Sequence, residues 1–384
     1  MSFADLLPSL TELRHDLHAH PELGFEEHRT AEMVARELRA IGLEVATGIG
    51  GTGVVGRLRA GSSDRAIALR ADMDALPIRE RTGLAYASRH DGVFHGCGHD
   101  GHVAMLLGAA RHLARTRNFD GTVNFIFQPA EEGLGGARAM IADGLFERFP
   151  ADHVFALHNW PDLPAGTAMT RAGPIMAAAD RFDLVIDGKG GHAALPHQTP
   201  DAILAASELV SQLNSIVSRR IPPTSAAVLS VTRIEGGQTH NVLPAQVAIT
   251  GTVRSFDRAV QDVIEAAIRQ IAEGVGIASG TRIGVTYDRY YPATINEASA
   301  ADMALAAARS VCDHAAMAPD PAFTSEDFAF MLNAKSGAYL WLGQGGGAPL
   351  HHPTYDFNDK VLGLGIGWFI ALAEQILHGA ETTR

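Results

Sequence analysis

The chain has 384 residues, of which 46% are hydrophobic and 19% are charged, and it carries a formal net charge of −12 at pH 7. These values are typical of a globular protein that is long enough for two domains, each with its own core. They argue against a nucleic-acid or anionic-membrane partner, because both would require clustered Lys and Arg side chains.

The chain contains two cysteines, Cys97 and Cys312, which are too few for a disulfide framework. Its first ten residues, MSFADLLPSL, lack the basic and apolar segments of a secretory signal. The apolar run at 361–373 is too short to span a bilayer before Glu374 interrupts it, and it predicts a buried C-terminal helix. We therefore expect a cytoplasmic protein without a membrane partner.

The first half of the chain predicts a sheet with helices on its faces. Apolar residues recur at helical spacing between residues 6 and 40, with one break at His-Pro-Glu-Leu-Gly, 20–24, so two helices are expected there. Short β-rich runs then alternate with helical runs. The expected strands are 53–59, 66–70, 122–127 and 153–158, and the expected helices are about 102–115 and 137–146.

The pattern changes near residue 177 to a β-α-β-β-α-β order, which resembles a ferredoxin-like insertion. After residue 292 the earlier alternation resumes. The predicted fold is α/β, with a catalytic domain formed by residues 1–176 and 291–384 and a small α+β domain inserted at 177–290. The expected elements of the second half are strands 181–187, 226–234, 246–256, 281–288 and 338–342, and helices 200–219 and 258–275.

Polar clusters lie at the ends of the predicted strands, where sheet-based enzymes place their reactive groups. Five such clusters stand out. They are Asp72-Met73-Asp74-Ala75-Leu76-Pro77, the segment HGCGHDGH at 95–102, Gln128-Pro129-Ala130-Glu131-Glu132-Gly133, His158-Asn159-Trp160 and Leu350-His351-His352-Pro353.

The segment HGCGHDGH combines a thiol with three imidazoles. Cys97 and His99 are two residues apart between glycines, so both side chains can face one point. Thiolate and imidazole together favour zinc, cobalt, nickel or manganese over magnesium or calcium. A lone cysteine is most often a small buried hydrophobic residue. The neighbouring histidines, and a predicted helix N-terminus that favours a thiolate, make Cys97 a candidate metal ligand.

The adjacent Glu131 and Glu132 would ordinarily form a solvated surface pair. Here they follow a strand and a rigid Gln-Pro, where consecutive side chains can point in different directions. One carboxylate can then bind a metal ion while the other takes a proton from water, as a hydrolase requires. His158, at a strand end, fits a core role and a functional role equally well.

Eight motifs follow one another along nearly the whole chain. They are RADMDALP, HGCGHDGH, QPAEEGLGGARAMIADGLF, ALHNWP, GGHAALPH, THNVLP, GTVRSFD and LHHPTYDFND. In this order they resemble the M20 metallopeptidase family, and closely its amidohydrolase branch of N-acyl-amino-acid hydrolases, which includes hippurate hydrolases. The resemblance implies an aminopeptidase-like catalytic domain with two divalent transition-metal ions, interrupted by a lid and dimerisation domain. It also implies a homodimer or homotetramer.

Carried over residue by residue, the resemblance implies five metal ligands, with the Cys97 sulfur bridging two ions where other M20 branches have an aspartate. Glu131 matches the general base, and Asp74 matches the carboxylate that orients a ligand. The five ligands are Cys97, His99, Glu132, His158 and His351.

Four neighbouring residues receive no firm ligand role from the resemblance. Other M20 branches have a histidine ligand where this chain has Asp72, so we do not expect Asp72 to bind metal in the same way. The family pattern favours His351 over His352. His95 and His102 match positions near the site.

Three residues of the inserted domain match residues that contact the substrate or its tetrahedral intermediate in related enzymes. By themselves, His192 fits an ordinary loop and Arg254 fits a surface charge on a strand, so these assignments depend on the resemblance. The three residues are His192, Asn241 and Arg254.

The predicted activity is metal-dependent hydrolysis of the amide bond of a small N-acyl amino acid, such as hippurate or an acetylated amino acid. Glu131 would move the proton, and His192, from the same or the partner subunit, would support the oxyanion. Within the family, the alternative is a dipeptidase or an N-acetyl-diaminopimelate-type deacetylase. Two other classes are a metal-storing or ligand-binding protein without chemistry, against which Glu131 beside Glu132 argues, and a thiol hydrolase using Cys97 with His99.

Overall fold

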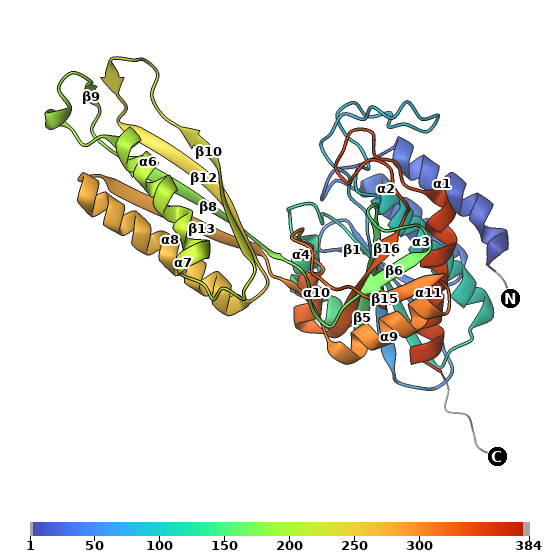
Figure 1. Ribbon diagram of the computed structural model, residues 1–384. Helices are drawn as coiled ribbons and strands as arrows, with labels where there is room; N and C mark the ends of the chain where they lie inside the picture. The colour runs from blue at the N-terminus through green and yellow to red at the C-terminus, as the bar shows by residue number, and fades with distance from the viewer. Residues whose placement is uncertain (1–2, 379–384) are drawn as a thin grey trace. The chain divides into compact units, whose positions relative to one another are not determined.

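The computed structural model describes residues 3–378, which divide into two compact units (Figure 1). The larger unit consists of Met1–Ile175, Thr294–Asp320 and Asp327–Arg384, and the smaller unit of Met176–Ala293 and Pro321–Glu326. The smaller unit therefore includes a short segment, 321–326, beyond the insertion expected at 177–290. None of the helices in the described part of the chain has the length and apolar character needed to cross a membrane.

An eight-stranded mixed sheet forms the centre of the larger unit, in the order β1-β2-β4-β3-β5-β16-β6-β15. Its four central strands, β4, β3, β5 and β16, run parallel to one another. Such strands are buried on both faces, and β3 is buried at every residue. The strands are β1 (Glu44–Ile49), β2 (Gly53–Ala60), β3 (Ala66–Asp72), β4 (Gly121–Gln128), β5 (His153–Trp160), β6 (Thr167–Thr170), β15 (His314–Met317) and β16 (Ser336–Gly343).

The helices of the larger unit cover this sheet. The long helix α3 packs against β3, and α1 and α11 in turn pack against α3 (Figure 1). The apolar run at 361–373 forms α11, whose aromatic residues Trp368 and Phe369 are fully buried, as the sequence predicted. The helices are α1 (Leu7–Ala19), α2 (His28–Ala40), α3 (His99–Thr116), α4 (Gly136–Ala142), α5 (Leu145–Arg148), α9 (Ala298–Arg309), α10 (Ala329–Ala334) and α11 (Leu362–Ile376).

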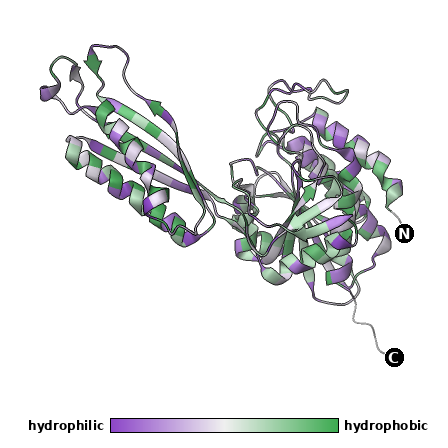
Figure 2. Cartoon of the chain, viewed as in Figure 1, coloured by the Kyte–Doolittle hydropathy of each residue, from purple (hydrophilic) through white to green (hydrophobic). Residues whose placement is uncertain are grey.

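The smaller unit has the β-α-β-β-α-β order that its sequence predicts. Its four-stranded antiparallel sheet has the order β10-β12-β8-β13, and α6 and α8 pack on it around one hydrophobic cluster (Figure 1). Figure 2 shows hydrophobic and hydrophilic residues alternating along α8, which turns one apolar side to the sheet. The elements are β8 (Ala178–Asp187), α6 (Ala202–Leu213), β10 (Ala227–Glu235), β12 (Gln246–Ser255), α8 (Arg258–Ser279) and β13 (Arg282–Tyr291).

Two helices predicted as continuous are interrupted. The helix expected at 137–146 is split into α4 and α5 at Gly144, whose φ of 78° lies in the left-handed region that helices do not use. The helix expected at 200–219 ends as α6 and restarts as α7 (Ser215–Arg219), with Asn214 between them. The Asn214 side-chain amide and its backbone N–H both donate to the carbonyl of Val210, which caps the end of α6.

One helix and two strand pairs of the structure were not expected from the sequence. The helix α9 buries a surface made largely of alanine, so its apolar periodicity is weak. The strand pairs are only a few residues long and gain their partners from distant segments. They are β9 (Gly191–His192) with β11 (Val242–Leu243), and β7 (Gly173–Met176) with β14 (Thr294–Asn296).

Candidate metal centre

The carboxyl ends of four parallel strands meet at one edge of the large sheet. Because β3, β4, β5 and β16 are parallel neighbours, the segments that follow them lie side by side. Asp74 follows β3, Glu131 and Glu132 follow β4, His158 lies near the end of β5, and His351 follows β16. Residues that are far apart in the sequence are thereby brought to one place.

All five predicted ligands come together at this edge, with Cys97 at the centre of the group. Cys97, His99 and His158 offer donor atoms within 4.8 Å of one another, and so do Cys97, Glu132 and His351. The Cys97 Sγ atom lies 3.3 Å from Nε2 of His158, and Nε2 of His351 lies 3.2 Å from Oε1 of Glu132. One thiol is therefore shared by two groups of three donors, which is the arrangement that a sulfur bridging two metal ions requires.

One ligand atom in this group is unsatisfied without an ion. Nε2 of His99 is buried and has no hydrogen-bond partner among residues 3–378. Burying such an atom unpaired costs ~1–3 kcal/mol, so it marks a place where another group is expected. The other imidazole nitrogens are held by carbonyl oxygens: Nδ1 of His99 lies 2.9 Å from the Asp74 carbonyl, and Nδ1 of His158 lies 2.7 Å from that of Asn159. The residues present fit two divalent transition-metal ions.

Asp74 connects two of the predicted ligands. One of its carboxylate oxygens lies 3.2 Å from Nδ1 of His99, and the other accepts a hydrogen bond of 2.9 Å from the backbone N–H of Glu132. This geometry suits the orienting role that the resemblance implied.

The backbone at two positions is adapted to this cluster. His351 has a φ of 63°, which is unusual for a residue with a side chain, and its N–H donates to the Gly96 carbonyl at 2.8 Å. Gly98, between Cys97 and His99, has a φ of 91°. A Cβ atom there would lie 2.4 Å from Oδ1 of Asn159. Only glycine therefore lets the segment that carries Cys97 and His99 pass this close to Asn159.

Asp72 is engaged by its neighbours. Its two oxygens lie 2.6 Å from Nη1 of Arg70 and 2.6 Å from Nδ1 of His102. Burial opposes ionisation, but the charges of Arg70, His99 and His102 hold the pKa of Asp72 well below its usual range. Asp72, His99 and His102 could also surround an ion, yet both Asp72 oxygens are already occupied. This fits the prediction that Asp72 does not act as a ligand in the usual way.

Buried polar residues outside the predicted ligand set support this edge. Asp327 accepts hydrogen bonds from Gln128 and Arg70 and from the backbone N–H of Ala137 at the start of α4. Nε2 of His102 lies 2.7 Å from Oδ1 of Asn159. Arg70 lies in the motif RADMDALP and Asn159 in the motif ALHNWP. A charged or amide side chain within a predicted buried strand could have marked both residues as members of a buried polar network.

The electrostatics of Cys97 argue against a thiol nucleophile. Burial, reinforced by the charges of Glu132 and Glu131, raises the pKa of the Cys97 thiol well above its usual range. A nucleophilic cysteine needs the thiolate, which this environment disfavours in the absence of a metal ion. A metal ion would instead stabilise the thiolate and release its proton.

Glu131 is buried beside the ligands without belonging to the two Cys97 groups. Its carboxylate lies within 4.8 Å of donor atoms of His99 and Glu132, and Oε1 lies 3.4 Å from the backbone N–H of Asp327. A carboxylate in this position can exchange protons with a reactant held at the ligand cluster.

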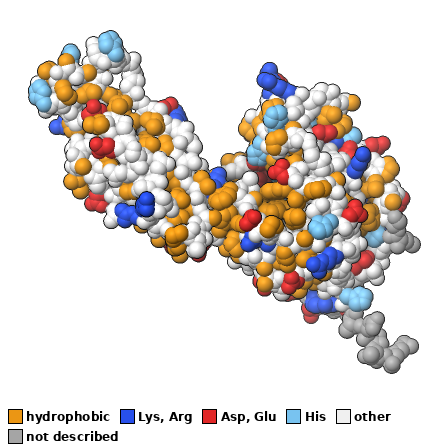
Figure 3. Space-filling view, in the orientation of Figure 1, with side chains coloured by type: hydrophobic (Ala, Val, Ile, Leu, Met, Phe, Trp, Pro, Cys, Tyr) orange, Lys and Arg blue, Asp and Glu red, His pale blue; other side chains and the backbone are white. Residues whose placement is uncertain are grey.

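The other three predicted site residues, His192, Asn241 and Arg254, lie in the smaller unit. His192 and Val242 are paired in the β9–β11 ladder, and the Asn241 carbonyl accepts from the N–H of Ala193, so His192 and Asn241 are neighbours. Arg254 lies on β12, on the face of the sheet opposite α6 and α8. Figure 3 shows histidine side chains exposed at the tip of this unit, where β9 lies.

The chain is similar to known proteins over nearly its whole length. A family model described as peptidase family M20/M25/M40 matches residues 68–375. The hippurate hydrolase of Campylobacter jejuni is 41% identical over 375 residues, covering 97% of this chain and 98% of the relative. An N-acetylcysteine deacetylase of Bacillus subtilis is 38% identical over 374 residues, covering 96% and 97%.

A solved structure from Bacillus subtilis, described as a dinuclear metal-binding peptidase of the M20 family, has a TM-score of 0.85 to this chain. The two are 35% identical, and the match covers 97% of this chain and 99% of the other. The mixed α/β fold predicted from the sequence is confirmed by this likeness.

The presence of Cys97 in both donor groups can be tested by measuring the metal content of the protein. We expect the wild-type protein to bind about two transition-metal ions per chain at saturation, because the donor set exceeds one tetrahedral site. Cys97→Ser should lower the affinity for both ions, since a hydroxyl is a much poorer anion than a thiolate. Elemental analysis after dialysis at graded free Zn²⁺ concentrations measures this.

Cys312→Ser is the matched control, because Cys312 is the other thiol of the chain and lies outside the donor groups. It should bind metal like the wild type. A wild-type stoichiometry of no more than one ion under metal-replete conditions would contradict the shared thiolate.

Proposed function

The chain belongs to peptidase family M20/M25/M40, and on this premise we propose that it is a metal-dependent hydrolase that cleaves the amide bond of small N-acyl amino acids. The observation that carries the proposal is the shared Cys97 thiol between two groups of metal-binding side chains, with the separate carboxylate of Glu131 beside them. The family assignment confirms the resemblance drawn from the sequence motifs.

The chemistry divides between the bound ions and the protein's own groups. Cys97, His99, Glu132, His158 and His351 would hold two ions of zinc, manganese, cobalt or nickel. When bound, such ions polarise a carbonyl group and make water more acidic. Glu131 accepts the proton of the attacking water and delivers it to the nitrogen of the departing amino acid, which completes cleavage to a carboxylic acid and an amine.

The substrate class follows from the family and the relatives. Hippurate and N-acetylcysteine, the compounds in the names of two similar enzymes, are both amino acids with an acylated nitrogen. We therefore propose hippurate-like or N-acetylated amino acids as substrates. The second candidate is a dipeptidase or an N-acetyl-diaminopimelate-type deacetylase, because these enzymes also hydrolyse an amide bond to the nitrogen of an amino acid. The unpaired thiols suit a reducing compartment, and we propose the cytoplasm.

We propose that the smaller unit recognises the substrate through His192, Asn241 and Arg254. The cationic Arg254 and the amide of Asn241 offer hydrogen-bond donors that suit a carboxylate in an otherwise acidic protein. His192 is exposed on β9 and can support the developing oxyanion, either in its own chain or in a partner subunit.

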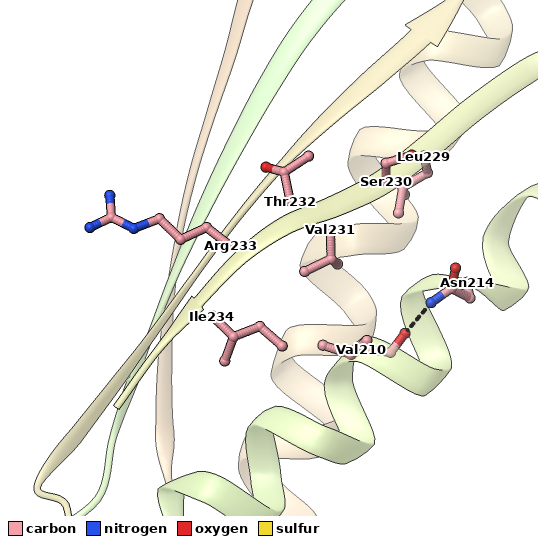
Figure 4. A pocket seen from close by; sticks show the side chains of 8 residues that line it. All are labelled: Val210, Asn214, Leu229, Ser230, Val231, Thr232, Arg233 and Ile234. Atoms are coloured by element: carbon pink, nitrogen blue, oxygen red, sulfur yellow. Dashed lines mark hydrogen bonds between the residues drawn. The ribbon is translucent and has the colours of Figure 1, made fainter. Parts of the chain in front are cut away.

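The smaller unit also offers a surface for a second copy of the chain. The strand β10 pairs with β12 on one side and, within residues 3–378, with no strand on the other. Val228 and Ile234 on this strand are exposed at 37% and 54%. A hollow of about 450 Å³ lies between α6 and β10. Among the residues that line it, Ile234 points toward Val210 (Figure 4). Because an open strand edge is a template for pairing, we propose a homodimer or a homotetramer built from such pairs.

The two adjacent glutamates give the sharpest test of the mechanism. Glu131→Gln keeps the shape and the five proposed ligands, so metal content and fold should be unchanged. Turnover should fall by ~10²- to 10⁴-fold or more, because the proton acceptor is lost. Glu132→Gln should instead weaken metal binding, and excess metal should restore part of its activity.

Both variants are compared with the wild type by hydrolysis of hippurate and N-acetyl amino acids and by metal content. Loss of metal in Glu131→Gln together with retention in Glu132→Gln would reverse the two roles. Unchanged turnover in both would disprove the proposed mechanism.

The substrate's carboxylate should matter for recognition. We expect an N-acyl amino acid to be cleaved with a kcat/KM at least ~10-fold higher than its carboxamide, because charged hydrogen bonds are worth ~1.5–3 kcal/mol. Arg254→Met should narrow this ratio. A panel of benzoyl and acetyl amino acids and their amides measures it, and equal cleavage of acid and amide would refute carboxylate recognition.

The strand edge is tested by oligomeric state. We expect light scattering to show the wild type as a dimer or tetramer, and the double variant Val228→Lys/Ile234→Lys to be a monomer, because charges on an edge strand oppose pairing. Ile277→Lys is the control, since Ile277 is a 77% exposed apolar residue of the same unit on α8. A monomeric wild type, or an unchanged assembly in the double variant, would exclude the β10 edge.

A further inference from the structure

The segment between α1 and α2, which the sequence marks only as a break between helices, lies against two loops of the metal centre. We call residues 22–27 the interhelical strap. Toward the Asp74 loop, the carbonyl of Glu22 accepts from the N–H of Ala75 at 2.8 Å, and Leu23 forms a parallel bridge with Ala75. Ala75 directly follows the carboxylate that orients His99 and Glu132.

Toward the other loop, the strap ends in a buried carboxylate. Glu27 has no exposed surface. Its Oε1 accepts from the backbone N–H of Ala130 at 2.8 Å, and its Oε2 accepts from the hydroxyl of Thr52. Gly24 packs against the same place, since a Cβ atom on it would lie 3.1 Å from the Cα of Ala130. The strap therefore holds the residue that immediately precedes Glu131.

Ala130 has a backbone conformation that needs such support. Its φ of 52° lies in the left-handed region, which is unfavourable for a residue with a Cβ atom. It begins the turn from which Glu131 and Glu132 project, and its carbonyl accepts from the N–H of Gly136 at 3.0 Å, which closes the loop. Ala130 is fully buried, so removal of the Glu27 carboxylate would leave its N–H buried without that hydrogen-bond partner.

We propose that Glu27 is a positioning residue for the hydrolytic site: with Thr52, it holds Ala130 in the left-handed conformation that sets the places of Glu131 and Glu132. The inference rests on the proposed function, because the roles of Glu131 and Glu132 come from it. The Glu27 carboxylate accepts from the Ala130 N–H and from the Thr52 hydroxyl, and it acts through them on the turn.

The geometry predicts which substitution is tolerated. A glutamine at position 27 has the same shape, so its oxygen can accept from Ala130 while its amide donates to the Thr52 hydroxyl, which can rotate to accept. A role in positioning therefore survives Glu27→Gln and is lost in Glu27→Ala. A role that depends on charge or on a transferable proton would be lost in both.

The test compares Glu27→Ala, Glu27→Gln and Thr52→Val in the metal-loaded enzyme. The control is Glu22→Ala, because the Glu22 carboxylate also accepts two backbone bonds, from Arg29 and Thr30 at 2.9 and 2.8 Å, but at the start of α2. We expect kcat on hippurate or an N-acetyl amino acid to fall ~10- to 100-fold in Glu27→Ala, with KM within about threefold, since misplaced catalytic groups lose up to ~10²-fold. Glu27→Gln and Glu22→Ala should stay within about threefold of the wild-type kcat.

Hydrogen–deuterium exchange of residues 128–136, followed by mass spectrometry, supplies a readout that needs no turnover. Exchange should be faster in Glu27→Ala and Thr52→Val than in the wild type, and unchanged in Glu27→Gln and Glu22→Ala. If Glu27→Ala does not fold, Thr52→Val carries the test with an expected ~3- to 10-fold loss of kcat, because it removes one of the two bonds.

Three results would overturn the proposal. They are wild-type kcat and exchange in Glu27→Ala or in Thr52→Val, an equal loss of kcat in Glu27→Gln and Glu27→Ala, and an equal loss in Glu22→Ala, which would indicate general destabilisation. If the wild type hydrolyses no N-acyl amino acid, the proposed function fails by itself, while the exchange comparison still decides whether Glu27 holds the turn.

Discussion

The parallel alignment of β3, β4, β5 and β16 is the constraint on which the metal centre depends. Each of these strands is a short buried run, and none of them carries a complete site. Parallel pairing places their carboxyl ends at one edge of the sheet. Loops that are far apart in the sequence therefore place their side chains close together in space. Two further candidate ligands come from the start of α3, which packs on β3: His99 is its first residue and Cys97 lies two residues before it.

A buried polar framework then holds this edge in register. Arg70 and Asp327 form one part of it, and Asp72 and His102 form another, with side-chain distances of 2.6 to 3.2 Å between bonded partners. Charged groups are expensive to bury unless they are paired and hydrogen-bonded, so this network tolerates little rearrangement. Its rigidity is an advantage where metal-binding side chains must keep fixed distances from one another.

The carboxylates of the centre illustrate how position separates roles that residue type does not. Asp72, Asp74, Glu131 and Glu132 have the same functional group. Asp72 is occupied by Arg70 and His102, while Asp74 bridges His99 and the backbone of Glu132. Glu132 presents an oxygen to the imidazole of His351, and Glu131 stays outside the two groups that share Cys97. Each environment favours a different task for the same chemical group.

The sequence by itself determined the alternation of strands and helices, the change of pattern near residue 177, and the buried C-terminal helix, because these follow from local periodicity. Its motifs also pointed to Cys97, His99 and the glutamate pair, since several metal-binding residue types stood close together. It did not determine the break at Gly144, the helix α9 or the strand pairs whose partners are distant, because backbone conformation and long-range pairing override weak local preferences. Only the tertiary structure decided that Arg70 engages Asp327 and that Glu27 reaches Ala130, and only it brings the two donor groups together around Cys97. These contacts join segments with no fixed spacing in the sequence, and packing of the whole sheet is what brings them within bonding distance.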